Sequence, residues 1–225
     1  QAARRPRAIA LRGRTGAISY AMLTGMVEHG AVRLAHGNGA IGVLLDNGPA
    51  WAVTDLAIRR AGRIAVPLPA FFTDAQLRHA LDDAAVETVI TDQPQRFQKI
   101  VPQAMRRVTS EAIAGTVCSR IDLAVSRHAT MPAGAAKITY TSGTTGTPKG
   151  VCLTAAAIDA VAQALLVRVD ATAVERHTSV LPLATLLENI AGLYLPLLAG
   201  GCSTLLPLAD VGMHGASAID AARLI

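Results

Sequence analysis

The chain has 225 residues, of which 51% are hydrophobic and 16% charged. This composition is ample for a packed core and too apolar for a disordered chain. Aromatic residues amount to only 3%, so nucleic-acid binding by base stacking is not favoured. The net charge of +5 comes from the start of the chain, where five arginines precede the first acidic residue, Glu28: Arg4, Arg5, Arg7, Arg12 and Arg14.

A basic start of this kind could contact nucleic acid or a membrane surface. A solvated terminus is the simpler interpretation, and we expect no nucleic-acid partner. The three cysteines are widely spaced without a Cys-x-x-Cys pair, which suggests neither a disulfide framework nor a zinc site and fits a reducing cytoplasm. Residues 190–209 contain no charge, but Pro196, Gly200, Gly201 and Pro207 divide them, so we expect no membrane span.

The first half of the chain alternates between short apolar runs and helical patterns, with turn residues between them. Strands are expected at residues 9–11, 17–20, 41–45, 64–68 and 87–91. Helices are expected at residues 20–34, 51–60 and 73–84, and from residue 94 onward. Thr73 is a suitable N-cap, and Pro94 stands where a helix tolerates proline.

The second half continues the alternation. Strands are expected at residues 117–125 (with a bulge), 137–140, 178–181 and 202–206, with a linker at 126–134. Helices are expected at residues 154–168 and 185–199, and one more is expected to begin at Ser217, which has Asp220 three residues later. Because Ile225 falls inside that last helix, we expect the sequence to be part of a longer chain.

Strands alternating with helices indicate an α/β fold made of mostly parallel sheet layers with helices on both faces. In such sheets ligands bind beyond the carboxyl ends of the strands. The strand at 137–140 is followed at once by a stretch rich in glycine and hydroxyl residues, from Thr141 to Gly150. The fold therefore predicts that this stretch faces a ligand.

The stretch from Thr141 to Gly150 has the chemistry of an anion-binding loop. Small residues let the backbone N–H groups approach an anion, hydroxyls add donors, and Lys149 adds a cation. A polyphosphate would suit it. The loop is a poor Walker motif, because Pro148 and Gly150 replace the required Gly and Ser or Thr, which argues against a kinase or NTPase of that type.

The same stretch reads Thr-Ser-Gly-Thr-Thr-Gly-Thr-Pro-Lys-Gly and resembles the signature of the adenylate-forming (AMP-binding) enzymes, which include acyl-CoA synthetases, luciferases and peptide-synthetase adenylation domains. Residues 41–51 and 62–69 also resemble this family. Residues 181–188 resemble the Leu-Pro-Leu-x-His-x-x-Glu motif of its fatty acyl-CoA synthetase branch. The chain would then be the first part of the family's large amino-terminal domain, with residues 1–134 as a first subdomain region and 135–225 as the phosphate-loop region.

The resemblance implies a two-step reaction, in which a carboxylic acid, here a fatty acid, reacts with ATP to give an acyl-adenylate that a thiol such as coenzyme A then takes up. Mg²⁺ would accompany ATP, and Thr145 is a candidate for a contact near it. Lys149 and Thr145 would be catalytic. The implied phosphate contacts are Thr141, Ser142, Gly143, Thr144, Thr145, Gly146 and Lys149.

Thr185 and Glu188 are the candidates for contacts with the acid substrate. Thr185 stands where acyl-CoA synthetases often have His or an aromatic residue, which puts the acyl specificity in doubt. Glu188 either orients the pocket or is a solvated or capped acid near a helix start, and the sequence leaves both open. Leucines beside it, such as Leu193, are more often core than ligand wall.

Some parts of the family that this chain resembles have no counterpart in the sequence. The Tyr-Gly-x-Thr-Glu motif, the ribose-binding Asp and the small carboxyl-terminal domain with its catalytic lysine do not occur before Ile225. We therefore expect the chain by itself to be inactive and the full-length protein to be a cytoplasmic acid–thiol ligase. The alternative is a non-catalytic nucleotide- or acyl-binding module. The acid, the acceptor and the oligomeric state are not predicted.

Overall fold

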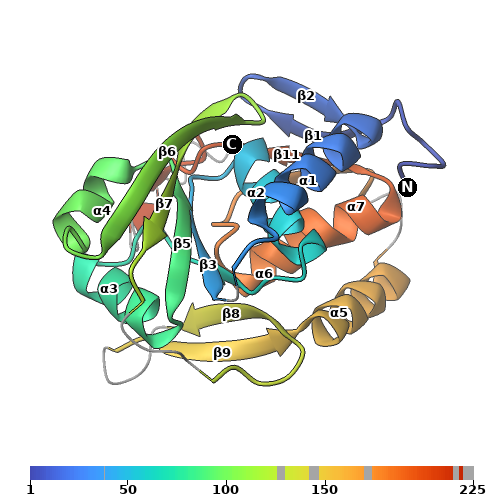
Figure 1. Cartoon of the computed structure of the whole chain (residues 1–225). Helices are drawn as coiled ribbons and strands as arrows, with labels where there is room; N and C mark the ends of the chain where they lie inside the picture. Colours follow the sequence, from blue (N-terminus) through green and yellow to red (C-terminus); the bar gives the residue numbers. More distant parts are fainter. Residues whose placement is uncertain (38, 126–129, 142–146, 170–173, 215–217, 220–225) are drawn as a thin grey trace.

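The computed structural model describes the whole chain except residues 38, 126–129, 142–146, 170–173, 215–217 and 220–225. The described residues form a seven-stranded sheet, a four-stranded sheet and a two-stranded ribbon, with helices packed around and between the two larger sheets (Figure 1). The predicted α/β fold is confirmed.

The seven-stranded sheet has the strand order β6-β7-β5-β3-β4-β8-β9. Its strands are β3 (Ala40–Leu44), β4 (Ala65–Pro67), β5 (Val86–Thr91), β6 (Met105–Ile113), β7 (Thr116–Leu123), β8 (Ala135–Thr141) and β9 (Lys149–Thr154). The four central strands β5, β3, β4 and β8 are parallel, whereas β7, β6 and β9 join antiparallel at the two edges. The parallel part expected from the sequence is thus the centre of the sheet.

The four-stranded sheet has the order β10-β11-β1-β2. Its strands are β1 (Ile9–Gly13), β2 (Gly16–Ser19), β10 (Arg176–Ser179) and β11 (Cys202–Leu205). Strand β1 pairs parallel with β11, and Leu11 lies opposite Ser203. Segments from the beginning and the later part of the sequence therefore share one sheet.

The predicted helix from Ser217 onward is wrong at residues 218 and 219. These residues form β13 (Ala218–Ile219), which pairs antiparallel with β12 (Met213–His214). A local capping pattern is a weak signal that backbone pairing with a neighbouring strand overrides. The remaining predicted positions of that helix, 217 and 220–225, lie outside the described residues.

Five helices follow the predicted positions closely, and the helix predicted at 185–199 is interrupted. The helices are α1 (Tyr20–Leu34), α2 (Pro49–Arg60), α3 (Asp74–Asp83), α4 (Pro94–Ile100), α5 (Ala155–Arg168), α6 (Leu186–Glu188), η2 (Asn189–Tyr194), which is a π-helix, and α7 (Leu195–Ala199). The Thr73 and Thr154 side chains cap α3 and α5 as predicted, each accepting a hydrogen bond from the backbone N–H three residues later.

The predicted helix at 185–199 is divided into α6, η2 and α7. Pro196 lacks the N–H that would bond to the carbonyl of Gly192 in a continuous α-helix. The hydroxyl of Ser203, on β11, donates to that carbonyl instead, at 2.5 Å. Gly200 ends α7 in the left-handed conformation with φ of 82°.

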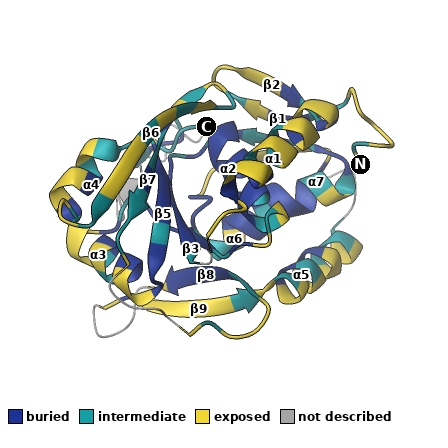
Figure 2. Ribbon diagram, viewed as in Figure 1, coloured by how far each residue is buried: buried dark blue, intermediate teal, exposed yellow. Residues whose placement is uncertain are grey.

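Helices cover both faces of the seven-stranded sheet. On one face α2 contributes Trp51 and Ile58, both fully buried, to a core shared with the four-stranded sheet. On the other face Leu77 of α3 and Phe97 of α4 pack on a second core. Figure 2 shows α2 and β8 largely buried, whereas β9 and α5 are mostly exposed.

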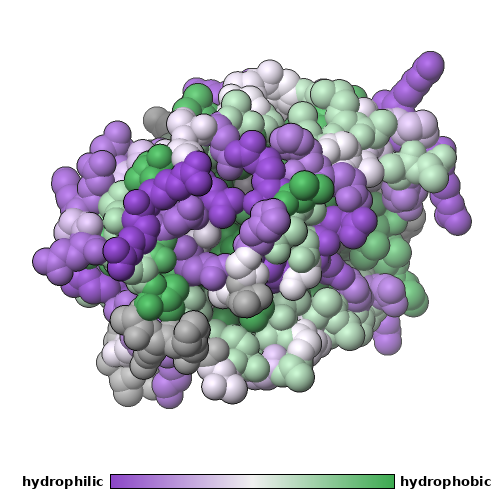
Figure 3. Space-filling view, viewed as in Figure 1, coloured by the Kyte–Doolittle hydropathy of each residue, from purple (hydrophilic) through white to green (hydrophobic). Residues whose placement is uncertain are grey.

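The exposed surface is mainly polar. On the face shown in Figure 3, hydrophilic side chains dominate and apolar ones are scattered. Helix α1 lies on this side and buries only Tyr20, Leu23, Ala31 and Leu34. Within the described part of the chain, no helix combines the length and apolar character needed to cross a membrane.

Candidate functional site

The carboxyl ends of β3, β4, β5 and β8 lie at one edge of the large sheet, because these strands are parallel. Of the described residues, those that follow these strands are 45–48, 68–73, 92–93 and 147–148. Parallel sheets bind ligands at this edge. Thr141 and residues 147–148, the described ends of the glycine- and threonine-rich stretch, thus lie at this edge.

This stretch connects the antiparallel strands β8 and β9. Thr141, the last residue of β8, lies opposite Lys149, the first residue of β9, and Tyr140 lies opposite Gly150. Directly opposed residues have Cβ atoms about 4.5–5.5 Å apart. Two of the predicted phosphate contacts, Thr141 and Lys149, are thus brought together, and both side chains are exposed.

The other predicted phosphate contacts, from Ser142 to Gly146, lie outside the described residues. Among them is Thr145, the second predicted catalytic residue. What the structure describes is the base of the loop, formed by Thr141 on one side and by Thr147, Pro148 and Lys149 on the other.

Helix α3 anchors this base. The Nε2–H of His79 donates to the carbonyl of Pro148 at 2.9 Å, and the imidazole ring packs edge-on against Tyr140, with ring centroids 6.3 Å apart. The hydroxyl of Tyr140 donates to the Asp83 carboxylate at 2.7 Å. Sequence reasoning missed His79 and Asp83, since both look like ordinary polar residues of a surface helix.

Gly150 is required by this packing. A Cβ added at Gly150 would lie 3.1 Å from Ile138 and 3.2 Å from the ring of Tyr140, closer than side chains normally approach. The glycine thus lets the tyrosine ring lie across the hairpin. A side chain here would push β9, and with it Lys149, away from β8.

Thr185 and Glu188 lie at the two ends of α6. Thr185 is its N-cap residue, and its hydroxyl donates to the carbonyl of Pro182 at 2.8 Å. The Glu188 side chain is 8% exposed, and its Oε1 lies 3.8 Å from Nε2 of His177, on β10. A Cβ at Gly192 would meet this Oε1 at 2.4 Å, so the carboxylate lies directly over the backbone of η2.

Oε1 of Glu188 is buried and has no hydrogen-bond partner among the described residues. The same holds for Nε2 of His177 and Oγ of Ser179. The solvated-acid interpretation of Glu188 is therefore excluded. Within the described part of the chain, Glu188 and Thr185 make their polar contacts with His177 and Pro182 and not with Thr141 or Lys149.

The loop after β3 links the two sheets. Asn47 donates from Nδ2 to the carbonyl of Leu181 at 2.8 Å and accepts from the N–H of Leu183 at 2.8 Å. The Asp46 carboxylate accepts from the N–H of Leu208 at 3.1 Å. Burial raises the pKa of Asp46, and the nearby charge of Asp92 acts in the same direction. Sequence reasoning treated this loop only as a turn.

A cavity of about 370 Å³ opens at the same edge of the sheet. Asp46 and Asp92 contribute carboxylates to its wall, and Phe71, Pro182 and Met213 contribute apolar surface. Its volume is within the range of small-molecule sites. Among the described residues no cluster of three or more His, Cys, Asp or Glu side chains could hold a metal ion.

The sequence model described as "AMP-binding enzyme" matches residues 1–222. The chain belongs to the AMP-binding enzyme family.

Curated relatives of this AMP-binding chain fall into two groups. The FR901469 synthetase of Dothideomycetidae sp. (strain 11243) is 35% identical over 164 residues, which is 68% of this chain and 1% of that protein. A probable CoA ligase, CCL8, of Humulus lupulus is 24% identical over 205 residues, 84% of this chain and 33% of the ligase. The resemblance to the fatty acyl-CoA branch in particular is not singled out by these relatives.

Solved structures support the fold. The o-succinylbenzoate CoA synthetase (MenE) of Bacillus subtilis, in complex with the acyl-adenylate intermediate OSB-AMP, matches with a TM-score of 0.69 and 22% identity. That match covers 91% of this chain and 53% of the synthetase. MatB of Rhodopseudomonas palustris matches with a TM-score of 0.68 and 23% identity over 90% of this chain and 42% of MatB. The chain thus spans about half the length of these solved proteins and less of the curated ones.

Proposed function

We propose that this AMP-binding chain supplies the phosphate-binding hairpin and part of the acid site of an ATP-dependent acid–thiol ligase. In the first step a carboxylate oxygen of the acid attacks the α-phosphorus of ATP, and pyrophosphate leaves. In the second step a thiol attacks the acyl carbon, and AMP leaves. The proposal is supported by family membership together with the pairing of Thr141 and Lys149 at the base of the loop.

Lys149 would stabilise charge that develops on the leaving pyrophosphate. The lysine is exposed at the carboxyl edge of the sheet and stands on a strand held by the Tyr140 and His79 contacts. A cation fixed in this way acts by electrostatic positioning. The hydroxyl of Thr141, opposite it, would donate to a phosphate oxygen, and Ser142 to Gly146 would add the remaining contacts.

Magnesium would accompany the nucleotide. The B. subtilis synthetase has been solved in complex with ATP and a magnesium ion, and Thr145 stays our candidate for a contact near that ion. Fatty acids remain the acid class that the Leu-Pro-Leu motif suggests, with coenzyme A as the acceptor. Amino acids are a second class, because several relatives are named as nonribosomal peptide synthetases or as hybrids that contain one.

The test is acid-dependent ATP–pyrophosphate exchange by the full-length natural protein, measured with a panel of fatty acids, aromatic acids and amino acids. We expect exchange with at least one acid. We expect Lys149→Ala to lower its rate by about 100- to 1,000-fold, the usual loss when one such electrostatic contact is removed.

Lys99→Ala is the matched control, since Lys99 is also exposed but lies on α4 and not on the hairpin, and its loss should leave the rate unchanged. Wild-type exchange by the Lys149→Ala variant would contradict the role of Lys149. The absence of exchange with every acid would contradict the ligase itself and favour a nucleotide- or acyl-binding module.

A further inference from the structure

Four buried polar side chains form a cluster on the face of the large sheet covered by α2. They are Asp55 of α2, Lys137 of β8, Asn189 and Tyr194 of η2, and they are called the lysine cluster below. Their exposed fractions are 0%, 2%, 1% and 6% respectively. Three segments far apart in the sequence thus meet at one ammonium group.

Every polar group of the lysine cluster has a partner within it. Nζ of Lys137 lies 2.7 Å from the Asp55 carboxylate and also donates to Oδ1 of Asn189 and to the hydroxyl of Tyr194. The Tyr194 hydroxyl donates to the other Asp55 oxygen at 2.6 Å. The three N–H donors of the ammonium group are therefore all used.

Such a cluster is poorly explained by stability alone. A buried ion pair loses its hydration and is commonly no more stable than apolar side chains of similar volume. Burial accordingly lowers the pKa of Lys137, and the Asp55 carboxylate opposes that shift. Hydrogen bonds, unlike apolar contacts, have fixed directions. We therefore expect the cluster to fix the positions of α2, β8 and η2 relative to one another.

The position of β8 matters because β8 leads into the phosphate-binding hairpin. Lys137 is four residues before Thr141 on the same strand. On its β4 side, β8 pairs with β4 where Ala65 lies opposite Lys137. On its other side, β8 pairs with β9, the second strand of the hairpin, from Ala135 to Thr141. Within the described residues, the lysine cluster is the polar link between β8 and the segments that cover this face of the sheet.

The other end of the cluster is the segment that carries the acid-site candidates. Asn189 and Tyr194 are the first and last residues of η2, which directly follows Thr185 and Glu188. π-Helical turns occur often at functional sites. The cluster thus joins the strand of the phosphate hairpin to the helix of the acid-site candidates.

We propose that the lysine cluster is a positioning device, in which Asp55, Lys137, Asn189 and Tyr194 hold the phosphate hairpin in register with the 185–194 segment. The proposal rests on the proposed function and extends it. All four side chains are buried, so we assign them a positioning role and no contact with substrate. A small displacement of the hairpin would misalign the phosphates with the attacking carboxylate, which lowers turnover more than nucleotide binding.

The test is Tyr194→Phe in the full-length natural protein, because it removes one hydroxyl and keeps the ring. We expect kcat for acid-dependent ATP–pyrophosphate exchange to fall about tenfold, with KM for ATP changed by less than about twofold. We also expect faster hydrogen–deuterium exchange at the β8 amides 138–141, which report local opening.

Tyr20→Phe is the matched control. Tyr20 is 5% exposed, and its hydroxyl donates to the carbonyls of Gly201 at 2.7 Å and Leu197 at 3.3 Å. It therefore also loses a buried tyrosine hydroxyl, but near the end of α7 rather than at β8. Its kcat and its β8 amide exchange should equal those of the wild type.

The proposal is overturned if Tyr194→Phe keeps wild-type kcat and β8 protection, or if Tyr20→Phe changes both equally. Should the wild-type protein show no pyrophosphate exchange with any acid, the proposed function fails, and the amide exchange alone decides. Faster exchange in β8 for Tyr194→Phe and not for Tyr20→Phe then still supports the positioning role. Equal exchange in the two variants refutes it.

Discussion

Two buried side chains, Tyr20 of α1 and Cys118 of β7, have a pKa raised by burial to about 12. Cys118 is fully buried, and the negative charges of Asp92 and Glu111 act in the same direction. A thiol that stays protonated in the folded chain but ionises in the unfolded chain makes folding dependent on pH. The structure therefore predicts an alkaline limit to stability.

Between pH 9 and 12 the folded state keeps the Cys118 proton that the unfolded state loses, so the free energy of unfolding should fall as the pH rises. One such group contributes at most about 1.4 kcal/mol per pH unit. Cys118→Ala should remove this share of the slope. Urea unfolding at several pH values measures it.

The control is Ile121→Val, a core change on the same strand that removes a methylene group and no ionisable group. It should lower stability by about 1 kcal/mol at every pH without changing the slope. An unchanged slope in Cys118→Ala would show that the thiol is not the group responsible.

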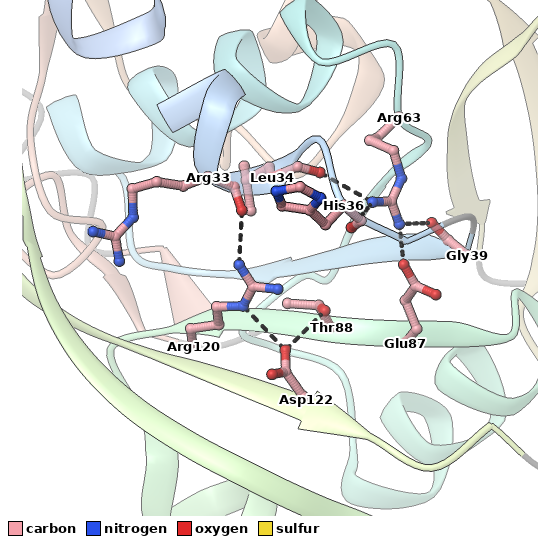
Figure 4. Close-up of polar contacts among 9 residues, drawn as sticks. All are labelled: Arg33, Leu34, His36, Gly39, Arg63, Glu87, Thr88, Arg120 and Asp122. Carbon is pink, nitrogen blue, oxygen red and sulfur yellow. Dashed lines mark hydrogen bonds and ion pairs between the residues drawn. The ribbon is translucent and has the colours of Figure 1, made fainter. Parts of the chain in front are cut away.

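At the scale of elements, two arginines hold the end of α1 and the following turn against the large sheet (Figure 4). Arg63 donates to the carbonyls of Leu34 at 3.0 Å, His36 at 2.5 Å and Gly39 at 2.5 Å, and it pairs with the Glu87 carboxylate. The Leu34 carbonyl is one that the end of α1 leaves without an intrahelical partner, and the other two belong to the turn that follows. One guanidinium thus ties α1 to β5.

Arg120 makes a similar but more exposed contact. It donates to the carbonyl of Arg33 at 3.0 Å and to the Asp122 carboxylate at 3.0 Å. Its side chain is 23% exposed, against 7% for that of Arg63. Because Arg63 is the more buried of the two, its replacement should destabilise the fold more than replacement of Arg120.

Arg63→Met should lower the free energy of unfolding by about 3–5 kcal/mol, because it leaves buried carbonyls and the Glu87 carboxylate without their donor. Arg120→Met should cost less than about 1 kcal/mol, as for exposed ion pairs. Urea denaturation of both variants gives the comparison. Equal losses of unfolding free energy in the two variants would contradict the claim that burial makes the Arg63 contacts more stabilising.

The elements themselves were largely predictable where the signal was local. Hydroxyl N-caps at Thr73 and Thr154 and the continuous apolar run in β3 gave boundaries within a residue or two. Strand β6 was missed, because Met105–Ile113 is half exposed at the edge of the sheet and carries no clear apolar alternation. Strand β9 was missed for the same reason, since most of its residues face solvent.

At the scale of the whole molecule, β1 and β2 complete a sheet whose other strands begin only at Arg176 and Cys202. Leu11 and Ala10 are fully buried there, and β1 lies between β11 and β2. The two larger sheets share the core around Trp51. The amino-terminal segment is thus part of the fold, although its first residues are mostly exposed.

Deleting residues 1–19 should abolish cooperative unfolding, since it exposes one side of β11 and the α2 face of the shared core. Deleting residues 1–5 should change the unfolding midpoint little. Urea unfolding followed by near-ultraviolet circular dichroism separates the two cases. A cooperative transition after the longer deletion would show that β1 and β2 are dispensable.

By itself the sequence determined the α/β class, most element boundaries and the position of a glycine- and threonine-rich stretch directly after a strand, because apolar periodicity, caps and a long glycine–threonine motif are local properties. Only the tertiary structure decided that Lys137 meets Asp55 and that Glu188 is buried against His177. It also decided that His79 holds Pro148. These contacts join residues that local periodicity treats independently, and their partners are fixed only when helices and sheets pack together.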